Sequence, residues 1–285
     1  MSPDIKSKLI FDERTLSTEQ IIESGGADLL GFNEVLQFLA SPDSGLTLGY
    51  DDRSRLLTDE AGNSYPRRGE LPLLIPTRLI QFYSDRLDIP YSAVSDSFLQ
   101  YYFLSTVKQS GELAGINSAT ENIHYQRHLY RMKDLLSSAR GRVLDVGCDD
   151  PMIGAALLDD SASYVGLDPF CKRPSPFRLI GFGENLPFRN ATFDCVVFNT
   201  SLDHIFDWRK AIDEARRVLV PKGLLFICTL IWTDRADLVN DAVHFHHFRD
   251  YEIMGQLSSW EVASIKRYDY KGADHRHGLY LSVSK

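Results

Sequence analysis

The chain has 285 residues, of which 44% are hydrophobic and 25% charged, an ordinary composition for a soluble globular protein with one large and one smaller domain. Its formal net charge is −8, and both halves carry an acidic excess, which argues against general nucleic-acid binding through phosphate contacts. No uncharged apolar run reaches the roughly 18–20 residues that a membrane helix needs, and the polar N-terminus is not a signal peptide. We therefore expect a cytoplasmic protein without membrane contact.

Four cysteines are widely spaced along the chain, and most of them lie in or beside apolar runs. They are Cys148, Cys171, Cys195 and Cys228. This usage favours small buried thiols in a reducing compartment over disulfides.

The first part of the chain differs in pattern from the rest. Residues 36–80 are dense in Gly, Pro, Asp and Ser, which predicts a compact, turn-rich module. Residues 120–141, "TENIHYQRHLYRMKDLLSSARG", have apolar side chains at helical spacing and stop at a glycine, so we expect a helix there. These features divide the chain into an N-terminal region, 1–115, and a main domain, 116–285.

From residue 141 onward, short apolar runs alternate with helical stretches. Such alternation predicts an α/β domain with a doubly wound parallel sheet, covered by helices on both faces. The last two runs are β-rich and separated only by a short polar stretch, which predicts an antiparallel pair. The expected strands are 141–147, 161–168, 191–200, 224–230, 260–270 and 278–285, and the expected helices are 151–160 and 207–220.

The first strand leads into "VLDVGCDDP", which begins like a nucleotide-binding loop with Asp145 and Gly147. Glycine lets the backbone approach a ligand, but Asp149 and Pro151 stand where such loops carry further glycines. Aspartate enters the left-handed region at modest cost, and proline is harmless at the first position of a helix. Asp168 follows about 20 residues later, where an acid can bind ribose hydroxyls; a surface aspartate explains it equally well.

Taken together, "RVLDVGCDDP", "YVGLDPF", "GFGENLPFRNATFDCVVFNTSLDHIFDWRKAIDEARRVLVPKGLLFI" and "HFHHFRDYEIMGQL" resemble a class I methyltransferase that depends on S-adenosylmethionine. The resemblance runs from about residue 120 to the C-terminus and is most specific over 181–227. It implies a Rossmann-like seven-stranded sheet with an antiparallel terminal strand, and S-adenosylhomocysteine as the product. The sequence departs from the family in its glycine loop.

The resemblance also implies which residues contact the cofactor. Asp145, Gly147 and Asn199 would lie beside the methionine part, Asp168 would hold the ribose, and Gly183, Glu184 and Asn185 would face the adenine. Asp149 would either pair with the cofactor's ammonium group or repel its carboxylate. Because the other cofactor positions are filled, we expect a reshaped loop that still binds.

On the acceptor side, His204 and Asp203 are the candidate catalytic residues, since a hydroxyl acceptor needs a base. The alternative for His204 is a structural histidine at the start of a helix. The run "HFHHF" places His244 and His246 on one face of an expected strand and His247 on the other. Two ligands are too few for zinc, so we predict no metal site and favour a structural or acceptor-binding role.

The module at 36–80 resembles the small zinc-ribbon domain related to the tRNA methyltransferase activator subunit. The four positions that match its cysteines hold Ser41, Ser44, Thr58 and Ala61, so the resemblance implies a ribbon that has lost its metal. Acceptor recognition, scaffolding or homodimer formation through the N-terminal region are the roles left open.

These observations favour a methyltransferase acting on a small-molecule or sugar-like acceptor, at oxygen. The altered loop and the missing ribbon cysteines leave an alternative, a catalytically silent homologue that serves as a binding or regulatory partner. A nicotinamide-dependent dehydrogenase would share the loop and the ribose acid, but it does not account for "ENLPF…FDCVVFN" or the antiparallel ending.

Overall fold

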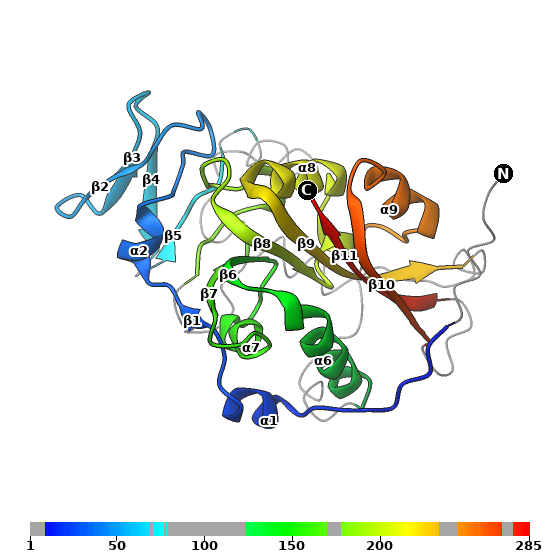
Figure 1. Cartoon of the computed structure of the whole chain (residues 1–285). Helices are drawn as coiled ribbons and strands as arrows, with labels where there is room; N and C mark the ends of the chain where they lie inside the picture. The colour runs from blue at the N-terminus through cyan, green and yellow to red at the C-terminus, as the bar shows by residue number, and fades with distance from the viewer. Residues whose placement is uncertain are drawn as a thin grey trace.

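The computed structural model describes residues 9–68, 71–76, 78, 123–169, 178–233, 244–269 and 276–285. Its centre is a seven-stranded sheet in the order β1-β7-β6-β8-β9-β11-β10 (Figure 1). The first five strands in this order are parallel to one another, whereas β11 pairs antiparallel with both β9 and β10. The predicted doubly wound sheet with an antiparallel end is confirmed. Its strands are β1 (Asp28–Leu29), β6 (Gly141–Val146), β7 (Ala162–Leu167), β8 (Phe193–Asn199), β9 (Leu219–Trp232), β10 (Glu261–Asp269) and β11 (Arg276–Ser284).

Helices cover both faces of this sheet (Figure 1). Helix α8 shows why: Ile212, Ala215 and Val218 recur at helical spacing and are fully buried, while the Asp207 side chain caps the helix by accepting from the amide of Lys210. None of the described helices is long and apolar enough to cross a membrane. One face carries α1 (Thr18–Glu23), α6 (Ile123–Leu135) and α7 (Pro151–Ala156), and the other carries α8 (Trp208–Val218) and α9 (Asp250–Gln256).

Two features of the sheet differ from the sequence expectation. Strand β1 lies in the N-terminal region but pairs with β7, with Asp28 opposite Ser163. The sequence did not predict this strand, because two residues are too few to show a strand pattern. Strand β9 begins at Leu219, five residues before the expected strand at 224–230, so "PKG" (221–223) lies inside the strand. There Lys222 adopts φ 66° and the register with β8 shifts.

The three described cysteines, Cys148, Cys195 and Cys228, are buried free thiols, as predicted; Cys171 lies outside the described residues. Burial raises the pKa of Cys195 to about 11. These thiols are therefore inert packing groups at neutral pH.

The N-terminal region forms a second, four-stranded antiparallel sheet in the order β2-β3-β4-β5 (Figure 1). It is joined to the main sheet's core, because Val35, Leu39 and Leu57 are buried in the same apolar cluster as Phe188. A bridge between Leu39 and Phe188 adds backbone hydrogen bonds. The elements are α2 (Phe32–Leu36), β2 (Gly49–Asp51), β3 (Leu56–Thr58), β4 (Ser64–Arg68) and β5 (Leu71–Pro72).

Two of the positions matched to zinc ligands take part in a hydrogen-bond network centred on Asp59. The Ser44 hydroxyl donates to Asp59 Oδ2 at 2.5 Å, and the Asn63 side chain donates to the same oxygen at 2.8 Å. The Ser41 hydroxyl lies 2.9 Å from that of Tyr65. Polar side chains thus bond to one another around the β3–β4 turn, and the likeness to a zinc ribbon stays a prediction.

Candidate functional site

A cavity of about 520 Å³ opens at the carboxyl ends of β6 and β8, beneath α6. This is the edge at which open α/β sheets bind their ligands. Half of the predicted site residues line it: Asp145, Gly147, Asp149, Asn199 and His204.

Asp145 is a carboxylate of the cavity with a strongly raised pKa. Its Oδ2 accepts a 2.7 Å hydrogen bond from the Tyr164 hydroxyl, while its Oδ1 is buried without a hydrogen-bond partner among the described residues. Burial raises the pKa of Asp145 to about 7, against the opposing effect of the Tyr164 hydrogen bond. An unsatisfied buried oxygen costs about 1–3 kcal/mol, so this carboxylate is arranged to meet a ligand.

The loop after β6 folds as the sequence allowed. Gly147 has φ 83°, and a Cβ there would lie 2.4 Å from that of Ser201. Asp149 adopts the left-handed φ of 44°, and Pro151 is the first residue of α7, with Asp150 as its cap. The aspartate and the proline therefore preserve a strand–loop–helix turn in place of glycines.

A second strained residue lies across the cavity, at the end of β8. Thr200 has φ 54°, which is rare for a β-branched side chain, and its amide donates to the carbonyl of Cys228 at 2.9 Å. Strain of this kind costs on the order of 1–3 kcal/mol and tends to gather at functional sites.

Asp168 stands at the end of β7, buried, outside the lining of the cavity. Its Oδ2 accepts a 3.0 Å hydrogen bond from the amide of Asp149, so this carboxylate supports the left-handed turn of the loop. The residues that follow, 170–177, lie outside the described ranges. A ribose-binding role for Asp168 stays a prediction.

The predicted adenine-side residues form the short 3-10 helix η4 (Gly183–Asn185). A Cβ on Gly183 would meet Ile205 at 2.8 Å, so glycine allows this segment to pack closely against its neighbours. Glu184 is buried, and its Oε1 lies 3.4 Å from the amide of Asp207 at the start of α8. The Asn185 side chain donates to the carbonyl of Pro42 and accepts from Arg78. Their adenine contacts stay predictions.

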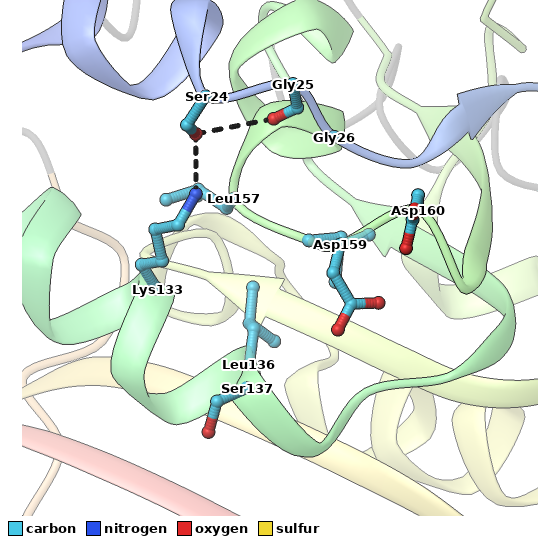
Figure 2. Close-up of a pocket in the computed structure, with 10 residues that line it drawn as sticks. Ser24, Gly25, Gly26, Lys133, Leu136, Ser137, Leu157, Asp159 and Asp160 are labelled. Atoms are coloured by element: carbon cyan, nitrogen blue, oxygen red, sulfur yellow. Dashed lines mark hydrogen bonds between the residues drawn. The ribbon is translucent and has the colours of Figure 1, made fainter.

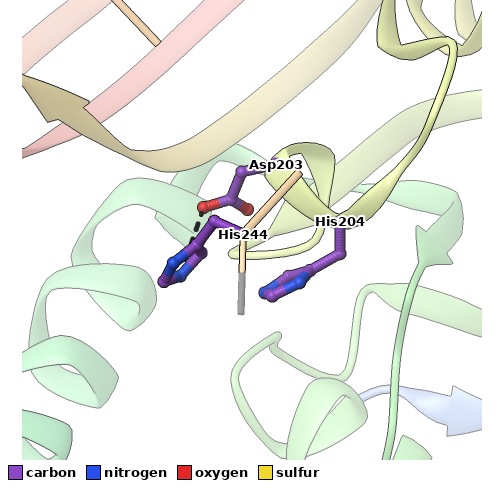
Figure 3. Close-up of side chains that lie close together, drawn as sticks. All are labelled: Asp203, His204 and His244. Atoms are coloured by element: carbon purple, nitrogen blue, oxygen red, sulfur yellow. Dashed lines mark ion pairs between the residues drawn. The ribbon is translucent and has the colours of Figure 1, made fainter. Parts of the chain in front are cut away.

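Asp203 and His204, the predicted catalytic residues, come together with His244 next to the cavity (Figure 3). Asp203 and His204 belong to η5 (Leu202–His204), and His244 arrives from a segment 40 positions further along the chain. His244 Nε2 lies 3.7 Å from Asp203 Oδ2, and the rings of His204 and His244 are 4.9 Å apart. We call these three residues the Asp203 cluster.

The remaining histidines of "HFHHF" point elsewhere. His246 Nε2 lies 2.8 Å and 3.0 Å from the carbonyl oxygens of Ile205 and Phe206, and His247 stacks on Trp232 with 4.1 Å between the rings. The expectation of a strand here was wrong, since residues 244–249 have no regular structure. Hydrogen bonds from Phe245 and His246 to the carbonyl of Asp203 hold this segment instead.

Sequence reasoning missed two residues of the cavity, Gly154 and His128, and also Tyr164, which bonds to Asp145. Tyr164 orients Asp145, and Gly154 is required beside it, because a Cβ there would lie 2.2 Å from the Tyr164 hydroxyl. His128, buried in α6, lies 2.9 Å from the hydroxyl of Tyr280 through Nδ1, and burial lowers the pKa of His128 to about 4. Its place three residues after Tyr125 on the apolar face of α6 was a signal that could have identified it.

Charge distinguishes this cavity from another cavity of similar size, in which Lys133 accompanies two aspartates. The lining of this cavity includes Asp145, Asp149 and Asp150 but, among the described residues, neither lysine nor arginine. A cavity of about 580 Å³ at the opposite edge of the sheet contains Lys133, whose ammonium donates to Ser24 at 2.8 Å (Figure 2). None of the predicted site residues lines it. The acidic cavity is the one that suits a cationic ligand.

Curated relatives include an uncharacterized methyltransferase of Mycobacterium bovis, 33% identical over 122 residues, which cover 39% of this chain and 59% of the relative. A "probable S-adenosylmethionine-dependent methyltransferase" of Mycolicibacterium smegmatis is 26% identical over 187 residues, which cover 61% of this chain and 72% of the relative. The chain thus spans about three fifths of the first relative's length. Among solved structures, the 1,6-didemethyltoxoflavin-N1-methyltransferase of Burkholderia thailandensis is 15% identical, with a TM-score of 0.49 over 65% of this chain and 89% of that one.

A sequence model of the family described as "Methyltransferase domain" matches residues 122–268, more than half of the chain. The matched range includes α6, strands β6 to β9 and most of β10, and therefore the whole lining of the acidic cavity. The chain belongs to the methyltransferase domain family.

Proposed function

We propose that this protein transfers a methyl group from S-adenosylmethionine to an oxygen atom of a small-molecule acceptor. The observation that carries the proposal is the buried carboxylate of Asp145, which lines an acidic cavity and whose Oδ1 has no hydrogen-bond partner among the described residues. The family and the relative from Mycolicibacterium smegmatis support the cofactor, and the acidic balance of the chain favours a small acceptor over RNA.

The residues present suit this cofactor. S-adenosylmethionine carries a sulfonium and an ammonium group, and the three aspartates of the cavity place negative charge near both. Tyr164 donates to one oxygen of Asp145, and the other has no hydrogen-bond partner among the described residues, so it is able to accept a hydrogen bond from a bound ligand. The left-handed Asp149 and the Gly147 turn bring backbone close to the cavity without blocking it.

The cofactor, when bound, supplies a methyl group that is already activated for displacement. The protein therefore mainly aligns the reactants, and good alignment is worth roughly 7–11 kcal/mol. Asp145, Asn199, Thr200 and His204 line one cavity, so a cofactor bound at Asp145 and an acceptor bound at His204 would share the same space. The Asp203 cluster lies at the acceptor end, where it assists the loss of the hydroxyl proton, a contribution commonly worth about 10²–10⁴ in rate.

A calorimetric titration of the cofactor-stripped protein with S-adenosylmethionine and S-adenosylhomocysteine tests the proposal. We expect micromolar binding of both. Asp168→Ala should weaken it by about 1.5–3 kcal/mol, roughly 10- to 150-fold, because a charged hydrogen-bond acceptor and the support of the Asp149 turn are lost together.

Asp160→Ala is the matched control, since this exposed carboxylate lies at the opposite edge of the same sheet (Figure 2). It should bind as the unchanged protein does. No binding up to millimolar concentration would instead support a silent homologue. Equal affinity in Asp168→Ala would remove Asp168 from the cofactor site.

A further inference from the structure

We propose that Asp203, His204 and His244 bind a divalent transition-metal ion at the acceptor end of the cavity. Two imidazoles and one carboxylate offer a donor set that suits Zn²⁺, Fe²⁺ or Co²⁺ better than Mg²⁺ or Ca²⁺. The three residues come from two segments that only the fold brings together, which is why the sequence predicted no metal (Figure 3).

The geometry is close to that of a metal site. The three ligand atoms lie within 4.8 Å of one another. Ligand atoms at about 2.1 Å from a tetrahedral Zn²⁺ are about 3.4 Å apart. Closure around an ion therefore requires these separations to shorten by at most about 1.4 Å. Rotation of the two histidine side chains, both half-buried, can supply it.

An independent observation points to a ligand at this place. Asp203 is 2% exposed, and its Oδ1 has no hydrogen-bond partner among the described residues. Its other oxygen faces the His244 ring at 3.7 Å, a distance that is too long for a hydrogen bond. A buried carboxylate is usually paired with a positive charge or coordinates a metal. A cation between Asp203 and the two imidazoles would supply that positive charge.

The backbone fixes the relative positions of the two segments. The carbonyl of Asp203 accepts hydrogen bonds from the amides of Phe245 (3.0 Å) and His246 (3.3 Å), which hold His244 against Asp203. His246 itself is engaged with two backbone carbonyls. Three protein ligands would therefore leave coordination positions open, as in catalytic rather than structural metal sites.

The position of the site suggests its role, which rests on the proposed function. His204 lines the cavity, so an ion bound to it would lie beside the space that an acceptor would occupy. A divalent cation favours loss of an acceptor hydroxyl proton to water. The oxygen's electron pair then forms the bond to the methyl carbon, while the carbon–sulfur bond breaks and its electrons return to sulfur.

The test is a Co²⁺ titration of the chelator-stripped full chain, followed by visible absorption and then by competition with Zn²⁺. We expect one equivalent of Co²⁺ to bind, with the absorption of a site ligated by nitrogen and oxygen. Asp203→Asn should weaken binding by on the order of 100-fold or more, because even residues that merely support metal ligands cost 10- to 100-fold. His204→Gln gives the same test with less risk to folding, because His204 lines the cavity and is less buried than Asp203.

His246→Gln is the matched control, because the new side chain can still donate to the carbonyls of Ile205 and Phe206. It should retain the Co²⁺ affinity. Absence of 1:1 binding, or equal affinity in His204→Gln and the unchanged chain, would overturn the metal site. Titration with S-adenosylhomocysteine on the same samples separates the proposals: cofactor binding without Co²⁺ binding refutes only the metal site, and the reverse refutes only the cofactor site.

Discussion

Two buried carboxylates, one in the N-terminal sheet and one in the main sheet, have opposite surroundings. Asp59 accepts hydrogen bonds from Ser44 and from both the backbone and the side chain of Asn63, and these bonds outweigh burial and lower the pKa of Asp59. Asp145 has one such partner, Tyr164, and burial raises the pKa of Asp145 to about 7. The first carboxylate stabilises its own sheet, whereas the second is left to meet a ligand.

The same contrast separates the four positions that match zinc-ribbon ligands from the Asp203 cluster. In the N-terminal module, the positions that match zinc ligands hold hydroxyl and methyl groups, and Ser41 and Ser44 bond to Tyr65 and Asp59. In the Asp203 cluster, Asp203 Oδ1 stays without a hydrogen-bond partner among the described residues. A buried polar group without a hydrogen-bond partner lowers the stability of the folded protein. Such groups are therefore expected mainly at functional sites, where a ligand can complete their hydrogen bonds.

The largest effect is expected from restoring the ribbon's ligands. Replacing Ser41, Ser44, Thr58 and Ala61 by cysteine should create a zinc site with an apparent binding free energy of about 10 kcal/mol or more. Thiolate-to-Co²⁺ charge-transfer absorption, which the Asp203 cluster cannot give, would report it. A variant that keeps Ala61 is the control and should bind more weakly. Four reactive thiols without such absorption would contradict the resemblance.

Asp145→Asn should stabilise the ligand-free protein at alkaline pH. The pKa of Asp145 is raised to about 7 from 3.8, so the unfolded chain loses this proton first, and the unchanged protein loses stability as pH rises from 4 to 7. The loss is at most about 4 kcal/mol, at 1.36 kcal/mol per unit of pKa. Urea unfolding at pH 5 and pH 8 should show the variant's advantage growing with pH. An advantage that does not change with pH would contradict the raised pKa.

Asp59→Asn should have the opposite effect on stability, lowering it where Asp145→Asn raises it. The pKa of Asp59 is lowered, so its contribution to stability is present above pH 4 and is lost as pH falls below 3.8. The amide should therefore lower the thermal midpoint at pH 7, by less than Asp145→Asn raises it at pH 8, and the difference should shrink on acidification. Thermal unfolding monitored by circular dichroism measures both. A midpoint that rises at pH 7 would erase the contrast between the two carboxylates.

The smallest effect is expected from Asp149→Gly. Glycine adopts φ 44° without strain, so stability should rise by less than about 1 kcal/mol, and S-adenosylhomocysteine should bind equally or more tightly. Asp149→Asn, which removes the charge but keeps the side chain's size, separates the charge from the backbone effect. A large loss of affinity in both variants would show that Asp149 is itself a cofactor ligand.

Much of the main domain was predictable because its signals are local. The apolar runs that became β6, β7, β8 and β11 and the helical spacing of α8 are patterns within a few residues of one another. The loop was predictable for the same reason, since the left-handed Asp149 and the helix-starting Pro151 follow from backbone sterics. Strand β1 was not, because pairing with β7 is decided by a partner more than 130 positions away.

The sequence by itself determined the order of strands and helices, the family, and five of the residues that line the acidic cavity, because periodicity and motif spacing are local patterns. Only the tertiary structure decided that Tyr164 holds Asp145, that Asn185 contacts the N-terminal module, and that His244 rather than His246 joins Asp203. These contacts depend on side-chain direction and burial, which arise when segments far apart in the chain pack against one another.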